Sequence, residues 1–89
     1  MSAPGFPHGM PEGLQRDLAK VEARLREDEQ HILHQRAVVQ DLEAHHRDPA
    51  LAQRLLDTFL ELQATHLADR DRIAAEIEAE AAMPIGRRL

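Results

Sequence analysis

Apolar residues recur at alternating intervals of four and three along the first half of the chain, a heptad pattern that predicts a long helix. The positions are Leu14, Leu18, Val21, Leu25, Asp28, Ile32, Gln35, Val39, Leu42 and His46. A seam this regular should pack lengthwise against a partner helix. Two polar residues, Asp28 and Gln35, interrupt the seam near its middle.

The second half of the chain carries two neighbouring seams. One contains Leu55, Phe59, Leu62, His66, Asp69 and Ile73, and the other contains Leu56, Leu60, Gln63, Leu67, Arg70, Ala74 and Ile77. A stripe this broad is wider than one partner helix covers, so part of it should face another chain. The residues expected at that interface are Leu55, Leu56, Phe59, Leu60, Leu62, Leu67, Ile73 and Ile77.

Proline and glycine divide the chain into two helical segments. Residues 1–11 contain three prolines and two glycines and are expected to form a flexible arm. Helices are expected over residues 12–47 and 49–83, followed by a tail over residues 84–89. Asp48 should cap the second helix and Pro49 should begin it. Because so few residues connect the helices, the pattern predicts an antiparallel two-helix hairpin.

The fold class is therefore all-α, and the broad apolar stripe favours association. A lone hairpin of about 70 ordered residues buries little apolar surface against the entropy it loses. Two copies that pack face to face would close a four-helix bundle, and two-fold dimers are the commonest homo-oligomers. A trimer or a bundle with another protein would bury the same stripe.

Charge and composition narrow the possible functions. Charged residues make up 30% of the chain and the net charge is −5, with both signs interleaved, so no basic face suits nucleic acid. No apolar run reaches the roughly 20 residues that span a membrane, and the N-terminus lacks the apolar core of a signal peptide. We therefore expect a cytoplasmic protein. Phosphate-loop, nucleophile-elbow and zinc-protease motifs are missing from the sequence, so we do not expect an enzyme.

Polar residues of the two segments are expected to meet. If the hairpin folds about residues 47–49, Asp28 lies level with Asp69 and His31 with His66. The resulting layer would contain Asp28, His31, Gln35, Gln63, His66, Asp69 and Arg70. One interpretation is a polar layer that sets helix register and needs no cofactor, and another is a seam that is simply hydrated there. The third is a divalent transition metal held by Asp28, His31, His66 and Asp69, because helix bundles bind metals with carboxylates and histidines three residues apart.

Two segments, "HILHQRAVVQDL" and "LLDTFLELQATHLADRDRI", carry a resemblance to a known group of proteins. The chain resembles short uncharacterised bacterial helical-hairpin proteins, which share a histidine-containing first helix, a brief turn and a leucine-rich second helix. The resemblance covers most of residues 14–77. It implies the hairpin fold and no activity, so it assigns no functional residue.

The function expected from these patterns is that of a homo-oligomeric interaction or scaffold module. A metal-binding four-helix bundle is one alternative. The other is a small regulator that presents its leucine face to a helix of another protein, with no role for nucleic acid or a membrane.

Overall fold

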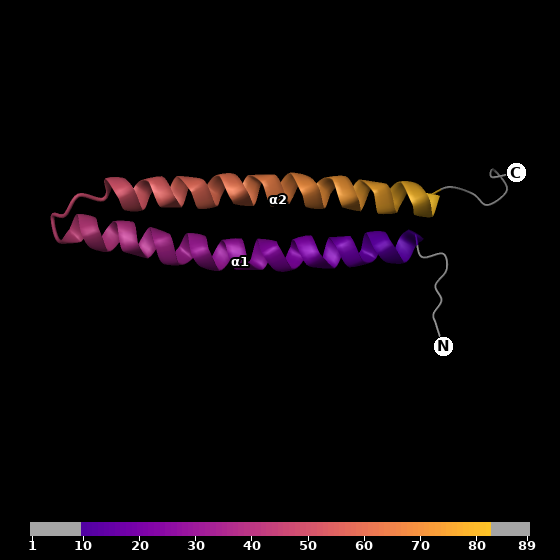
Figure 1. The fold of residues 1–89 in the computed structure, drawn as a ribbon, viewed down its shortest axis with the longest axis horizontal. Coiled ribbons are helices and arrows are strands. Elements are labelled where there is room, and N and C mark those ends of the chain that lie inside the picture. The colour runs from indigo at the N-terminus through magenta and orange to yellow at the C-terminus, as the bar shows by residue number, and fades with distance from the viewer. Residues whose placement is uncertain (1–9, 83–89) are drawn as a thin grey trace, which may run out of the picture.

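The structure, a computed structural model, describes residues 10–82 as two helices packed against each other, with no strand among those residues. Helix α1 spans Met10–Ala44 and helix α2 spans Ala50–Ala82. They run antiparallel, so that the start of α1 and the end of α2 lie at the same end of the hairpin (Figure 1). The predicted all-α hairpin is confirmed. Neither helix is long and apolar enough to cross a membrane.

The helix limits differ from those expected. Helix α1 begins at Met10, inside the segment expected as an arm, and Pro11 fits there because the first turn of a helix needs no backbone N–H donors. The helix ends at Ala44 rather than at residue 47, and α2 begins at Ala50 rather than at Pro49. The rest of the expected arm and the whole of the expected tail lie outside the described residues.

Helix α1 ends in a Schellman motif, in which two backbone N–H groups close the last turn. Arg47 N–H donates to the carbonyl of Leu42 at 2.8 Å, and His46 N–H donates to the carbonyl of Glu43 at 3.1 Å. The motif requires a left-handed residue, and His46 fills that position with φ of 56°. His46 therefore lies in the turn, although the heptad placed it on the seam.

Helix α2 begins with the expected cap. The Asp48 carboxylate accepts a hydrogen bond from Ala50 N–H at 3.0 Å, and the Pro49 carbonyl accepts one from Gln53 N–H at 2.7 Å. The carboxylate thus satisfies one of the donors that every helix leaves without a partner at its start.

The seam of α1 is confirmed over its helical length, with Val21, Asp28, Ile32, Gln35 and Val39 buried. On α2, the residues that face α1 again alternate at four and three, but they come from both expected seams. They are Ala52, Leu56, Phe59, Gln63, His66, Arg70, Ile73 and Ile77, all buried or partly buried. The two expected seams are therefore one central seam with a flank on each side.

The flanks give the hairpin two broad faces, each built from residues seven apart. The His31 face consists of Asp17, Arg24, His31 and Val38 on α1 with Leu55, Leu62, Asp69 and Glu76 on α2. The Leu67 face consists of Gln15, Glu22, Glu29, Arg36 and Glu43 on α1 with Leu60, Leu67, Ala74 and Ala81 on α2. Asp17, Arg24 and Asp69 line one cleft on the first face, whereas Gln15 and Ala81 line another on the second.

Candidate functional site

A buried carboxylate–imidazole pair joins the two helices near the middle of the hairpin. Asp28 Oδ2 on α1 lies 2.6 Å from His66 Nδ1 on α2, and the side chains are only 6% and 16% exposed. With Asp28 ionised, Nδ1 carries the proton donated to Oδ2. The other ring nitrogen, Nε2, is then the ring atom that can bind a cation.

The second polar residue of the α1 seam is also bonded across the helices. The Gln35 Nε2 group donates to the backbone carbonyl of Ala52 at 3.0 Å. Among the described side chains, no buried nitrogen or oxygen lacks a hydrogen-bond partner. Both interruptions of the apolar seam are therefore satisfied, which limits the cost of burying them.

The register of this layer differs from the expected one. Asp28 was expected beside Asp69 and His31 beside His66, yet Asp28 meets His66. Because α1 ends three residues earlier and α2 begins one residue later than expected, the hairpin folds about residue 47, whereas the expected pairs are centred between residues 48 and 49. That shift moves the partner of Asp28 by about one helical turn along α2.

His31 and Asp69 lie away from the buried pair. His31 is exposed, with its ring centroid 5.4 Å from that of Phe59. Asp69 Oδ1 accepts a hydrogen bond from Arg72 at 3.0 Å, and Arg72 also pairs with Glu76 at 3.2 Å, as the four-residue spacing of these two charges allows. The carboxylates of Asp69 and then Glu76 raise the pKa of Arg72, which keeps its charge.

Of the four candidate metal ligands, only Asp28 and His66 are brought together. Within the part of the chain that the structure describes, no three His, Asp or Glu side chains gather in a way that could hold a metal ion. A metal would need ligands besides Asp28 and His66, and the metal site stays a prediction.

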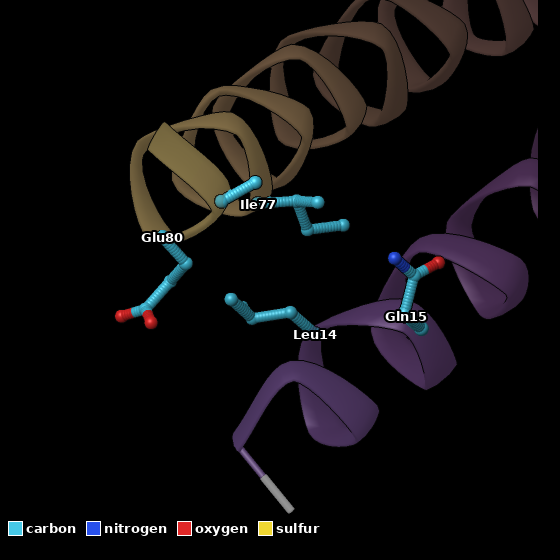
Figure 2. A pocket seen from close by; sticks show the side chains of 5 residues that line it. Leu14, Gln15, Ile77 and Glu80 are labelled. Carbon is cyan, nitrogen blue, oxygen red and sulfur yellow. The ribbon is translucent and has the colours of Figure 1, made fainter. Parts of the chain in front are cut away.

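Two clefts at the ends of the hairpin are small. One lies at the open end, has a volume of about 200 Å³ and is lined by Leu14, Gln15, Ile77, Glu80 and Ala81. Figure 2 shows Leu14 and Ile77 projecting into the space between the helices. The other, of about 270 Å³, is lined by Asp41, Leu42, His45 and Arg47 beside the turn. Both fall below the roughly 300 Å³ at which small-molecule pockets begin.

The residues expected at an oligomer interface divide into two groups. Leu56 and Ile73 are buried between the chain's own helices, while Phe59, Leu60 and Ile77 are partly buried there. Leu55, Leu62 and Leu67 remain 46%, 44% and 37% exposed. Sequence reasoning did not find Leu51, which is 74% exposed, because this residue lies on neither expected seam.

The chain matches no protein-family model, no curated protein and no solved structure. The resemblance to bacterial helical-hairpin proteins therefore stays an expectation.

Proposed function

We propose that this chain is a self-associating interaction module whose hairpin closes into a four-helix bundle with a second copy. One observation carries the proposal: Leu55 and Leu62, two turns apart on one flank of α2, are nearly half exposed beside the core. Among the side chains that the structure describes, a single hairpin buries five apolar ones, Val21, Ile32, Val39, Leu56 and Ile73. Apolar flanks beside so small a core favour burial against a partner.

The dimensions of the hairpin suit this partner. A helix of about 35 residues is roughly 50 Å long, and two helices side by side are about 20 Å wide. One face therefore presents on the order of 1,000 Å², and a stable interface buries about 800 Å² per partner. A second hairpin of the same length and width covers such a face.

The module acts by binding rather than by catalysis. The buried Asp28–His66 pair could position a proton, but no serine, threonine or cysteine contacts it among the described residues. A nucleophilic mechanism requires such a third group within hydrogen-bond reach of the base. The pair instead links α1 to α2 and holds their register.

The test is the mass of the full chain in solution, measured by light scattering at micromolar concentration alongside circular dichroism. We expect about twice the 10.1 kDa of one chain, with the helices intact. A mass near 10.1 kDa with full helicity would refute self-association. In that case the remaining candidate partner for the exposed leucines of α2 is an amphipathic helix of another protein.

A second candidate function, metal binding, is supported by the Asp28–His66 hydrogen bond, since metal-binding histidines usually donate their other N–H to a carboxylate or carbonyl. His66 would offer Nε2, and the second copy would supply further ligands. We expect Zn²⁺, Ni²⁺ and Mn²⁺ to leave the melting temperature of the wild type unchanged. A gain that a chelator reverses and that His66→Ala abolishes would establish the metal-binding function instead.

A further inference from the structure

We infer that the second copy docks on the His31 face, with both turns at the same end of the bundle and the two-fold axis parallel to the helices. This arrangement rests on the self-association proposed above and adds its surface and geometry. We call residues 29–65, nearer the turn, the turn half, and residues 10–28 with 66–82 the open half.

The two faces differ in what α1 contributes. On the His31 face, partly buried Val38 of α1 lies on the same side as Leu55 and Leu62 of α2, so both helices supply apolar surface in the turn half. On the Leu67 face, the leucines of α2 lie beside Glu29 and Arg36 of α1, both exposed. Burying the second face would remove those charges from water, and the cores of interfaces are poor in charged residues.

The contact of Asp28 with His66 sets which flank residues share a level. Counting one turn from that pair, His31 lies level with Leu62, and a further two turns place Val38 level with Leu55. In the other direction, Arg24 lies level with Asp69, and both line one cleft of about 170 Å³.

A two-fold axis parallel to the helices places α1 of one copy against α2 of the other at the same level. Val38 then meets Leu55 of the second copy, and Arg24 meets Asp69 of the second copy. An axis across the helices, centred on His31 and Leu62, would instead bring Val38 against Arg24 and Leu55 against Asp69. Of these two axes, the parallel one matches apolar Val38 with Leu55 and the opposite charges of Arg24 and Asp69. It also places Asp17 level with Glu76 of the second copy, where Arg72, bonded to Glu76, offsets the like charges.

The charges of the open half are available for this contact. Asp28, one turn from Arg24, is bonded to His66, and Arg24 makes no ion pair with any side chain of residues 13–82. Asp69 gives only Oδ1 to Arg72 and stays 46% exposed, so its Oδ2 can accept from an arginine of the second copy. Asp17, Lys20 and Arg72 line the same cleft, which keeps the local charge mixed.

Matched leucine substitutions distinguish the faces. Leu62→Glu and Leu67→Glu place the same charge on the same helix at similar exposure, but on opposite faces. We expect Leu62→Glu to raise the dimer dissociation constant at least about 100-fold and Leu67→Glu to leave it within about threefold, as measured by sedimentation equilibrium. Circular dichroism of both variants checks that the hairpin is intact. Dissociation by Leu67→Glu, or by both changes equally, would overturn the assignment.

Charge reversal tests the axis. Arg24→Asp alone and Asp69→Arg alone each make both cross-copy contacts repulsive, and each should raise the dissociation constant about tenfold. In an equimolar mixture of the two variants, both contacts of a heterodimer are attractive. The mixture should therefore dimerise at the same protein concentration as the wild type. Because dimerisation recovers only when both variants are present, the restored ion pairs must form between chains and not within one chain. Arg36→Asp, the matched change on the Leu67 face, should leave the mass unchanged.

The outcomes separate the two proposals. A wild type with the mass of one chain removes the proposed function itself. A wild-type dimer whose Arg24→Asp and Asp69→Arg variants do not pair with each other keeps self-association and removes the parallel two-fold axis. A mass of three or more copies removes the two-fold arrangement.

Discussion

The turn half and the open half of the hairpin are built from the same heptad but hold together differently. In the turn half, Ile32, Val39 and Leu56 form one buried cluster, and Phe59 and Leu60 pack against it. Among the open-half side chains that the structure describes, the buried apolar ones are Val21 and Ile73, and the ion pairs of Asp69, Arg72 and Glu76 beside them lie within α2. The difference shows that one heptad pattern can specify both a well-buried apolar cluster and a stretch in which most seam residues are only partly buried.

The Asp28–His66 pair lies at the border between these halves. Its atoms are buried and bonded to each other, so a shift of the helices by one turn would leave a buried polar group without a partner. We propose that the pair fixes the register that brings the apolar cluster of the turn half together. The exposed leucines Leu55, Leu62 and Leu67 on the flanks also lie in or next to the turn half, so the proposed self-association would bury most apolar surface there.

The largest expected effect compares the cores of the two halves. Leu56→Ala removes a side chain from the buried cluster and should lower the free energy of unfolding by about 2–5 kcal/mol. Ile73 packs against fewer apolar neighbours, so Ile73→Ala should lower the free energy of unfolding by about 1 kcal/mol less than Leu56→Ala. Urea unfolding followed by circular dichroism measures both, with exposed Leu33→Ala as a control near zero. A larger loss for Ile73→Ala would reverse the comparison.

An intermediate effect is expected at the border. Asp28→Ala leaves the buried imidazole of His66 without its acceptor and should cost about 1–3 kcal/mol. Replacing both Asp28 and His66 by leucine removes the polar pair together and should give a stability equal to or above that of the wild type. Thermal unfolding of the single and double variants tests this. An Asp28→Ala variant as stable as the wild type would show that the pair does not fix the register of α1 against α2.

The smallest expected effect is a gain at the turn. His46 has φ of 56°, a conformation that costs most residues about 1 kcal/mol and glycine almost nothing. His46→Gly should therefore stabilise the hairpin by about 1 kcal/mol in urea unfolding. His45→Gly is the matched control, because His45 lies next to it without a positive φ, and it should not stabilise. Destabilisation by His46→Gly would mean that the side chain of His46 contributes more to stability than its left-handed backbone costs.

The hairpin and the α1 seam could be predicted because both depend on local patterns. The seven-residue repeat of apolar positions specifies which side of α1 is buried. Asp48 and Pro49 mark the start of α2. The last residue of α1 could not be predicted. Nothing in the sequence distinguishes a histidine that ends a helix in the left-handed conformation from a histidine within the helix. That error of three residues displaced the whole expected polar layer by one turn.

The site was less predictable than the fold for the same reason. The sequence identified Asp28 and His66 as members of one layer, and they do meet. It also grouped His31 and Asp69 with them, because a face assigned by spacing alone does not separate the centre of a seam from its flank. The doubled seam of α2 had the same ambiguity, and only burial separated Leu56 from Leu55.

The most direct measurement of the interface on the His31 face is an isotope-filtered nuclear Overhauser experiment on a mixture of labelled and unlabelled chains. Only contacts between different copies give a signal. Methyl cross-peaks between Val38 of one copy and Leu55 of the other are the predicted result. If the intermolecular signals instead connect Leu67 with Leu60, or if none exist at concentrations where the hairpin is folded, the second copy does not dock on the His31 face.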